Sequence, residues 1–309
     1  MSQQLLLIRN PASAGGRNQD ERLARVVAQL KSEGYSVTIL ATSGPGSAVE
    51  LAGRHGASFD SVIAAGGDGT VREVADGLVR TGAPVSLGIL PFGRGNDVAR
   101  MVGTATDDDF LETLRIGDSD CMDTLRIQVI GPNGTRETHT GLLFAAVGFA
   151  GEVLRKTTPR VVRWFGPRLC YSVGFLRATA SYQAPHVTVR SGSRSESGPL
   201  FLACAANSPH AGGGTMQLAP GARIADGRLN MSIIRHIGRM GVLRQFPALL
   251  RGTHVNDPRV LYFEAPDMSV ETDRPVPVAI DGDLMGTTPT RFEVASRSLR
   301  VLTRRRFSS

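Results

Sequence analysis

The sequence has few cysteines and few aromatic residues, and it has no long apolar run. Three cysteines among 309 residues, with no CxxC pair, argue against a disulfide framework or a structural zinc site and favour a reducing cytoplasm. No stretch approaches the roughly 20 consecutive apolar residues of a membrane span. The arginines are not interleaved with aromatic residues in any cluster, so a nucleic-acid partner is not expected.

Lysine is nearly absent as well. Only Lys31 and Lys156 are lysines among 35 basic residues, so arginine carries almost all of the positive charge behind the net charge of +7. Arginine binds phosphates through bidentate hydrogen bonds. Charge alone therefore leaves a nucleotide, a nucleic acid or an anionic membrane open as partners, and a genome that favours arginine codons explains the same excess.

The remaining composition is that of a globular protein with a substantial core. The length predicts about two domains, and 41% of the residues are hydrophobic while 20% are charged. The N-terminal run LLLI is short and has no cleavage site after it. We therefore expect it to be a first strand and not part of a signal peptide.

The first third of the chain alternates short apolar segments with amphipathic ones. This rhythm predicts a parallel sheet with helical crossovers, in which ligands bind beyond the carboxyl ends of the strands. Four polar, glycine-rich loops fall at such ends: NPASAGG, ATSGPGS, GGDGT and PFGRGND. The expected strands cover residues 5–10, 36–42, 60–67 and 85–93, and the expected helices cover residues 17–35, 48–56 and 71–82.

The pattern changes near residue 124. Segments that alternate apolar and polar residues, with turn signals between them, predict a mostly antiparallel β domain that is interrupted by one helical stretch at about 167–182. We place the domains at residues 1–124 and 125–299, and expect the tail from about 300 to 309 to return to the first domain.

GGDGT combines glycines with one acid, Asp68. Glycines let backbone N–H groups approach a phosphate closely, and a helix that follows adds its positive end. No GxxxxGK[ST] motif occurs, so this is not a P-loop. Asp68 is suited to Mg²⁺, which takes one or two carboxylates together with phosphate oxygens. A simple Asp-Gly turn remains the alternative.

The other loops are more ambiguous when each is taken alone. PFGRGND is either a second phosphate loop or a capped turn, and NPASAGG is typical of an ordinary Asn-Pro turn. Near the C-terminus, Asp281-Gly-Asp283 ends a strand, where two acids serve equally well as a turn, a metal site or a general base.

Taken together, the motifs resemble the diacylglycerol kinase catalytic-domain family, particularly its bacterial lipid kinases and the related sphingosine kinases. The resemblance covers nearly the whole chain. It includes NPASAG, GGDGTVREVADGL and PFGRGNDVAR, then ACAANSPHAGGGTMQLAPGARIADGRL, and finally IDGD with TRFEVASRSLRVL. It implies an N-terminal α/β nucleotide domain, similar to NAD kinase and phosphofructokinase, followed by an antiparallel β-sandwich domain, with ATP in the cleft between them.

The resemblance also implies an activity and its residues. Such kinases transfer the γ-phosphate of ATP to a lipid hydroxyl with the help of Mg²⁺, and the position that acts as base is Asp283. A structural Mg²⁺ site would use Asp226 and the main-chain carbonyls of Arg223 and Arg228. A network associated with Mg²⁺ would contain Asp68, Asp97 and Asp123. The ATP-binding residues would be Asn10, Pro11, Ala12, Ser13, Ala14, Thr42, Gly66, Gly67, Asp68, Gly69 and Thr70, joined by Arg94 and Asn96 of the second glycine loop.

The sequence departs from the family pattern at three positions. Asp283 stands where the family usually has Glu, Arg94 replaces a hydroxyl residue, and Ala14 replaces a glycine. Arg94 would supply positive charge beside the phosphates or would point to solvent. The alternatives are a catalytically weak nucleotide- or lipid-binding protein, suggested by these departures, and an NAD kinase-like enzyme, which shares GGDGT.

The acceptor lipid must come from a bilayer, so we expect a cytoplasmic enzyme that is peripheral on the inner face of the membrane. The segment 155–169 mixes basic residues with Trp164 and Phe165, and it is a candidate contact with anionic lipid or, alternatively, a part of the core of the second domain. The sequence does not identify the acceptor. It also leaves the oligomeric state open, with a homodimer as one alternative.

Overall fold

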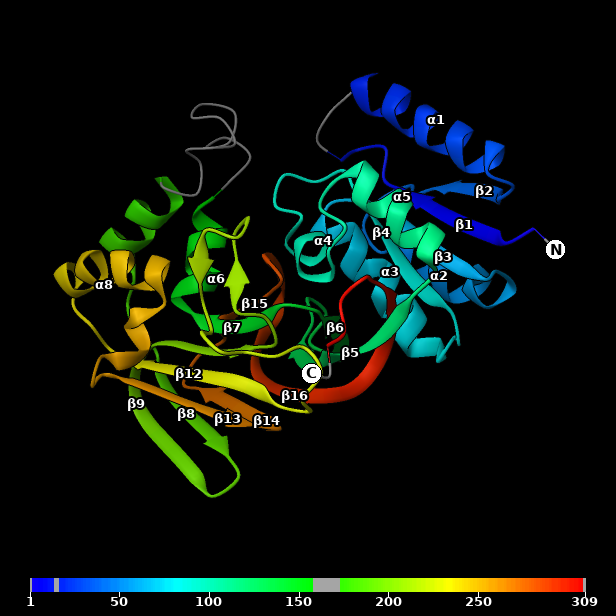
Figure 1. Ribbon diagram of the computed structural model, residues 1–309. Coiled ribbons are helices and arrows are strands. Elements are labelled where there is room, and N and C mark those ends of the chain that lie inside the picture. The colour runs from blue at the N-terminus through cyan, green and yellow to red at the C-terminus, as the bar shows by residue number, and fades with distance from the viewer. Residues whose placement is uncertain (1, 14–16, 158–172, 308–309) are drawn as a thin grey trace. The chain divides into compact units, whose positions relative to one another are not determined.

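The computed structural model describes residues 2–13, 17–157 and 173–307. The chain forms two compact units, which are described separately (Figure 1). Unit 1 contains Met1–Thr124, Ile224–Asp226 and Ser296–Ser309, and unit 2 contains Leu125–Arg223 and Gly227–Ala295.

Unit 1 alternates strands and helices as the sequence predicts. Three features differ from the expectation: helix α3 begins at Asp68, inside GGDGT, and not at Val71, helix α1 ends at Ser32 and not at residue 35, and helix α5 was not expected. The elements are β1 (Gln4–Arg9), α1 (Arg17–Ser32), β2 (Ser36–Ala41), α2 (Ser47–His55), a 3-10 helix η1 (Gly56–Ser58), β3 (Ser61–Gly66), α3 (Asp68–Thr81), β4 (Ser86–Pro91), α4 (Asp97–Val102) and α5 (Asp107–Ile116).

The strands of unit 1 form a parallel sheet. Strand β1 pairs with β2 and β3, and β3 pairs with β4. The end of the long strand β16 (Asp283–Leu302) joins the free side of β4, with Val301 opposite Leu87 in parallel register. The order across this sheet is therefore β2-β1-β3-β4-β16. The last strand of the chain thus completes the sheet that the N-terminal strands form.

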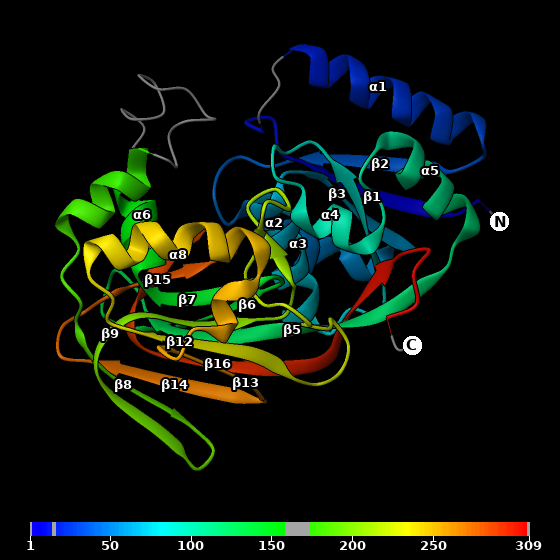
Figure 2. The same ribbon diagram turned by 60° about the vertical axis from the view of Figure 1, so that its left-hand side comes forward.

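Helices cover both faces of this sheet (Figure 2). The apolar stripe of α1, with Leu23 and Leu30 at its ends, packs with α5 against one face of the sheet. On the other face, α2 and α3 approach each other closely at Gly77, where a Cβ atom would lie 2.4 Å from the carbonyl oxygen of Val49. Only glycine allows this approach, and the contact fixes α3, which carries the GGDGT motif at its start.

Unit 2 is rich in antiparallel strands. It contains the second half of β5 (Ser119–Ile130), β6 (Arg136–Gly141), β7 (Phe144–Gly148), β8 (His186–Ser191), β9 (Arg194–Ala206), β10 (His210–Ala211), β11 (Met216–Gln217), β12 (Leu229–Arg235), β13 (Val260–Ala265), β14 (Asp267–Thr272), β15 (Pro277–Ile280) and the first part of β16. Its helices are α6 (Phe149–Lys156), a helix over residues 173–181, α8 (Arg239–Arg251) and the 3-10 helix η2 (Thr253–Asn256).

The strand pairing of unit 2 closes into a ring. Strand β7 pairs with β9, β9 with β8, β8 with β14, β14 with β16, β16 with β15, and β15 again with β7. The long strands β9 and β16 make this closure possible, because each pairs with different neighbours along its two halves. The antiparallel domain that the sequence predicts is therefore barrel-like.

Alternate residues of these strands supply two separate cores. Val147 and Ala203 face the interior of the ring, and Met231 of the adjoining strand β12 packs in the same core. Ala146 and Cys204, one position along, face outward and are covered by helices. The sequence predicts a single helix near 167–182. The described part of that stretch is helical at 173–181, α6 and α8 are additional helices, and residues 167–172 lie outside the described residues.

Candidate functional site

Three motif loops follow adjacent parallel strands of unit 1. Residues 10–13 follow β1, GGDGT begins at the last residue of β3, and PFGRGND begins at the last residue of β4. The strands neighbour one another in the order β1-β3-β4, so their carboxyl ends lie at the same edge of the sheet. The amide of Asn10 also donates to the carbonyl of Ala65, with an N···O distance of 3.2 Å.

The GGDGT and PFGRGND loops touch through their backbones. A Cβ atom on Gly93 would lie 2.5 Å from the Cα of Gly67, and a Cβ atom on Gly95 would lie 2.6 Å from Oδ2 of Asp68. Both distances are shorter than side chains tolerate. Gly93 is therefore required by the backbone of the first motif, and a side chain at position 95 would displace the carboxylate of Asp68. Neither motif reveals this relation alone.

Asp68 occupies the centre of this contact. Its Oδ1 accepts a hydrogen bond from the amide of Val98 in the first turn of α4, at 3.2 Å. Burial raises the pKa of the Asp68 carboxyl above its usual range, the Val98 amide acts in the opposite direction, and the negative charge of Asp97 raises it further. A half-buried carboxylate beside a second acid is suited to a cation.

Asn10 links the first loop to GGDGT. Its Nδ2 donates to Oγ1 of the buried Thr70 at 3.1 Å, while its Oδ1 accepts from the amide of Ala12 at 2.9 Å. Ser13 donates through Oγ to the carbonyl of Asn10 at 2.6 Å. The amide of Thr42 donates to the carbonyl of Arg9, so the end of β2 lies beside the same loop.

The other residues predicted to bind ATP are Pro11, Arg94, Asn96 and Ala14, and their surroundings differ. Pro11 is exposed, and Arg94 is exposed in the PFGRGND loop. Asn96 has a left-handed backbone, with φ of 50°, and exchanges hydrogen bonds with both the amide and the carbonyl of Gly93. Asn96 therefore shapes the loop. Ala14 lies outside the described residues.

Several residues that the sequence analysis did not select hold these loops in place. Gln19 and Arg22, both on α1, donate to the carbonyls of Phe92 at 3.0 Å and Pro91 at 3.1 Å. Glu73, on α3, accepts from the amides of Gly46 at 2.9 Å and Ala48. In the sequence these residues differ from their neighbours only as polar side chains on the sheet-facing side of a helix. That pattern does not show which loop each side chain contacts.

The predicted acids are only partly brought together. Asp97 lies close enough to Asp68 to raise its pKa. Asp123 is fully buried, where its Oδ1 accepts from the amide of Arg297 at 2.7 Å and its own amide donates to the carbonyl of Ile224. Among the residues that the structure describes, no three His, Cys, Asp or Glu side chains form a group that could hold a metal ion.

The second predicted Mg²⁺ site lies around Ile224–Asp226, which belongs to unit 1, whereas Arg223 and Arg228 belong to unit 2. The guanidinium of Arg228 forms an ion pair with Glu264, with an N···O distance of 3.4 Å. The assignment of Arg223, Asp226 and Arg228 to a structural metal stays a prediction.

The IDGD segment of unit 2 separates its two acids. Asp281 and Gly282 form a two-residue hairpin turn between β15 and β16, both with positive φ, as a tight primed turn requires. The Asp281 carboxylate accepts from the amides of Leu142, Leu143 and Phe144 at 2.7, 2.8 and 2.9 Å. Asp283 is the first residue of β16 and is exposed. Asp281 is therefore structural, and Asp283 has the exposure that a base requires.

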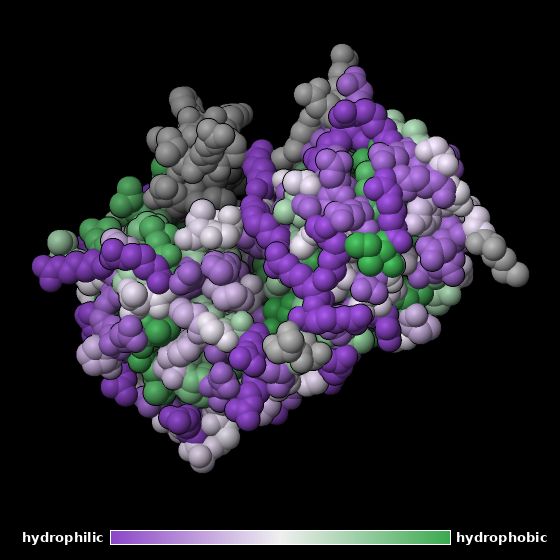
Figure 3. Space-filling model, in the orientation of Figure 1, coloured by the Kyte–Doolittle hydropathy of each residue, from purple (hydrophilic) through white to green (hydrophobic). Residues whose placement is uncertain are grey.

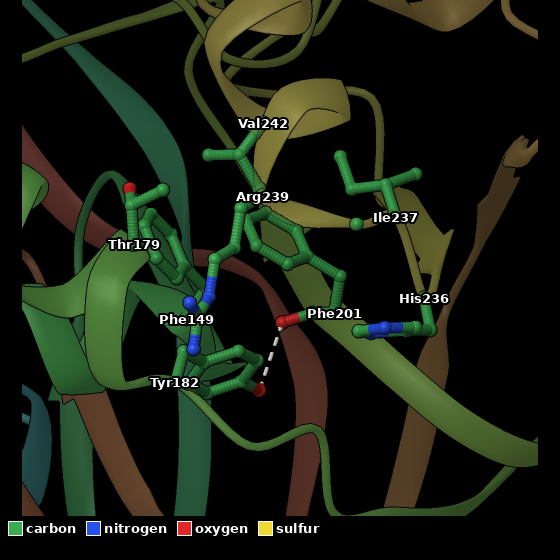
Figure 4. Close-up of a pocket in the computed structure, with 9 residues that line it drawn as sticks. Phe149, Thr179, Tyr182, Phe201, His236, Ile237, Arg239 and Val242 are labelled. Atoms are coloured by element: carbon green, nitrogen blue, oxygen red, sulfur yellow. Dashed lines mark hydrogen bonds between the residues drawn. The ribbon is translucent and has the colours of Figure 1, made fainter.

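Unit 2 also contains an aromatic pocket of about 180 Å³ (Figure 4). Phe149 stacks on Phe201 with ring centroids 4.4 Å apart, and Tyr182 meets the Phe149 ring edge-on. The Tyr182 hydroxyl donates to the carbonyl of Phe201 at 3.1 Å, and burial raises the pKa of Tyr182. Figure 4 shows Arg239 and Val242 reaching the pocket from α8. The aromatic and aliphatic side chains share the lining with the polar side chains of Thr179, His236 and Arg239.

Two consecutive family models match the chain. Residues 4–127 match the diacylglycerol kinase catalytic domain, and residues 145–303 match the YegS C-terminal NAD kinase beta sandwich-like domain. This pair of domains defines a lipid kinase architecture. The chain belongs to the diacylglycerol kinase family, in its bacterial YegS-like form, so the family that the motifs indicate is confirmed.

Individual relatives agree with this result. The chain is 28% identical to a diacylglycerol kinase of Bacillus subtilis, covering 96% of this chain and 95% of that protein. It is 30% identical to a "Probable lipid kinase YegS-like" of Chromohalobacter salexigens, covering 90% and 86%. A crystal structure of a diacylglycerol kinase from Bacillus anthracis shares its fold, with a TM-score of 0.72 and 20% identity over 97% of each chain. None of the helices in the described ranges has the length and hydropathy of a bilayer-crossing segment.

Proposed function

We propose that this chain transfers the γ-phosphoryl group of ATP to the hydroxyl of a lipid of the diacylglycerol type. The observation that carries the proposal is the contact of two glycine loops around Asp68, in a chain that belongs to a lipid kinase family. Glycine-rich backbone at the start of α3 suits phosphate oxygens, because the N–H groups are accessible and the helix dipole is favourable there.

In this proposal the loops of unit 1 bind ATP. The amides of Gly66–Thr70 receive the phosphates, and the Asn10 side chain keeps Thr70 in position through its hydrogen bond. Thr42, at the end of β2, contributes from the neighbouring loop. Arg94 is exposed and near the same motif, so it supplies the positive charge that a P-loop lysine would otherwise provide.

Mg²⁺ is part of the proposal because the donor set fits it. Asp68 and Asp97 offer two neighbouring carboxylates, and Mg²⁺ typically takes one or two carboxylates together with phosphate oxygens and water. When bound, the ion neutralises charge on the phosphates during transfer. The raised pKa of Asp68 also indicates that a cation would be favourable at this carboxylate.

Asp283 is proposed as the general base. Its carboxylate takes the proton of the lipid hydroxyl while the hydroxyl oxygen bonds to the γ-phosphorus and the bond from that phosphorus to ADP breaks. Asp281 has no such role, since three backbone amides occupy its oxygens. The aromatic pocket of unit 2 is proposed to receive part of the acceptor's hydrocarbon, for which its Phe149 and Phe201 lining is suited.

The proposal is tested with radiolabelled ATP and mixed micelles of candidate lipid alcohols, by measuring label in the organic phase. Asp68→Asn and Asp283→Asn are expected to lose at least about 100-fold in kcat/KM. Asp273→Asn is the matched control, because Asp273 is another exposed acid of unit 2. Equal activity of the Asp283 variant and wild type would remove Asp283 from the chemistry.

Two outcomes of the same assay favour the alternatives. Measurable ATP binding without label in any lipid would identify a nucleotide- or lipid-binding protein. Label transferred to NAD and not to lipid would identify an NAD kinase-like enzyme. A screen of lipid extracts, followed by mass spectrometry of the phosphorylated products, would then identify the acceptor. Because ATP is the donor, the proposal places the reaction in the cytoplasm, at the inner face of the membrane.

A further inference from the structure

Helix α8 presents an apolar side to solvent. In the described part of the chain eight large hydrophobic side chains are exposed, and five of them gather on α8 and the neighbouring helix 173–181. We call these five the α8 face: Leu176 (59% exposed), Met240 (66%), Leu243 (42%), Phe246 (39%) and Leu250 (39%). Exposed apolar side chains that are scattered singly are ordinary, but a contiguous group marks an interaction surface.

The α8 face follows from the helical repeat. Met240, Leu243, Phe246 and Leu250 are spaced by three, three and four residues, so they share one side of α8. Of the thirteen residues of α8, only Val242 is buried. Helix 173–181, which carries Leu176, lies beside α8, because its Phe175 contacts Phe246 with ring centroids 4.9 Å apart. In Figure 3 hydrophobic residues are visible over α8, mixed with hydrophilic ones.

The charged residues on α8 and on helix 173–181 are all arginines, and the nearest acid, Asp257, accepts from Gln245 of α8 and is paired with Arg259. Arg244 and Arg251 are exposed on α8, and Arg177 is exposed on helix 173–181. The sequence contains no Asp or Glu from Gly227 to Asn256, and none in 173–181. An exposed apolar stripe flanked by arginines, without acids, is the pattern of a helix that lies in the interface of an anionic membrane.

We infer that the α8 face docks this protein on an anionic lipid bilayer, with Met240, Leu243, Phe246 and Leu250 inserted among the acyl chains. A symmetric contact between two copies fits less well, because it would bring the arginines of both copies together without an acid on either helix to pair with them. A bilayer with anionic headgroups satisfies the apolar and the basic side chains at the same time.

The inference rests on the proposed lipid kinase activity. Docking on a bilayer would bring the enzyme to the membrane that contains its lipid acceptor. Val242, the buried residue of α8, lines the aromatic pocket (Figure 4). The residues of the α8 face are exposed on the same helix. Docking would therefore bring the acyl chains within about one helix diameter, roughly 10 Å, of the pocket. A lipid would then have a short path from the bilayer into unit 2.

The test measures co-sedimentation of the protein with vesicles of phosphatidylcholine alone or with added phosphatidylglycerol. Arg244→Gln with Arg251→Gln should weaken binding to anionic vesicles about 25-fold, from about fivefold for each arginine. Leu243→Ser with Phe246→Ser should weaken it at least about tenfold. Binding of the wild type should also fall in 0.5 M NaCl, at which surface charges are screened.

Matched controls come from unit 1. Ile116→Ser removes a hydrophobic side chain that is 52% exposed on α5, and Arg54→Gln removes an exposed arginine on α2. Both should leave vesicle binding unchanged. Phe246→Ser removes the ring contact with Phe175, so the Leu243 and Phe246 double variant is expected to unfold at a somewhat lower temperature, and the other variants, which change exposed side chains, at the wild-type temperature. Should the Leu243 and Phe246 double variant fail to fold, Met240→Ser serves as the independent test.

The inference is overturned if the wild type does not bind anionic vesicles, or if the α8 variants bind them as the wild type does. It is also overturned if light scattering finds a wild-type dimer that these substitutions convert to a monomer without an effect on vesicle binding. Activity on dihexanoylglycerol in solution separates the two proposals. The α8 variants should retain it, and a wild type that binds vesicles but phosphorylates no acceptor would contradict only the proposed function.

Discussion

The two acids of the IDGD segment should respond to substitution in opposite ways. Asp281 accepts three backbone hydrogen bonds, from Leu142, Leu143 and Phe144, at 2.7 to 2.9 Å. A hydrogen bond to a charged group contributes about 1.5–3 kcal/mol. Because one carboxylate serves all three amides and water replaces part of the loss, Asp281→Ala should lower the free energy of unfolding by about 4 kcal/mol.

The substitution Asp281→Asn should cost less. The Asn side chain keeps one acceptor oxygen, which can still serve Leu143 and Phe144, while its nitrogen cannot accept from Leu142. Asparagine also tolerates the left-handed backbone at this position, where φ is 50°. We expect a loss of about 1–2 kcal/mol, so the two variants should differ measurably in a urea titration.

Asp283 supplies the matched comparison two residues away. It is exposed, so Asp283→Asn should change the free energy of unfolding by less than about 0.5 kcal/mol, while phosphorylation of lipid is lost. Urea unfolding followed by circular dichroism, and the micelle assay on the same preparations, measure both properties. A destabilised Asp283→Asn together with an Asp281→Ala as stable as the wild type would refute this division of roles.

Further predictions concern unit 1. Gly93→Ala should raise the KM for ATP at least about tenfold, since its Cβ would lie 2.5 Å from Cα of Gly67, and Gly53→Ala, whose Cβ meets only ordinary contacts, is the control. Asn10→Ala should raise the same KM through loss of the bond to Thr70. Asp68→Asn should abolish activity yet raise the unfolding temperature. Because the folded-state pKa of Asp68 lies above its unfolded value, the ionised carboxyl opposes folding as pH rises past about 4. The increase in unfolding temperature caused by Asp68→Asn should therefore be larger at pH 8 than at pH 4. Equal increases at the two pH values would contradict this account.

The sequence predicts the framework of unit 1 well because its signals are local. Each strand of that unit is a short apolar run followed by a glycine-rich loop, and parallel pairing then brings the loops to one edge. The start of α3 was misplaced because Gly67 and Gly69 are poor helix formers, and the contact with Gly93 that fixes the loop is made by residues distant in the chain.

Other parts of the site could not be predicted, because their partners lie far away in the sequence. Asp281 looks equivalent to Asp283 in IDGD, yet its function depends on amides about 140 residues earlier. Helix α8 was missed because Pro247 interrupts its pattern and its apolar side is not buried, so it resembles neither a strand nor a core helix. The closure of the ring in unit 2 depends on β9 and β16, each of which pairs with different neighbours along its two halves, and hydrophobic periodicity does not predict such pairing.

The chain passes between its two units at four peptide bonds, after Thr124, Arg223, Asp226 and Ala295. Neither unit is therefore encoded by one continuous stretch of gene. A fragment that stops at residue 124 would lack the fifth strand of its sheet and would leave the carboxylate of Asp123 without the Arg297 amide. Recombination that exchanges one half of the gene would thus damage both halves of the product, and the two units are expected to be inherited together.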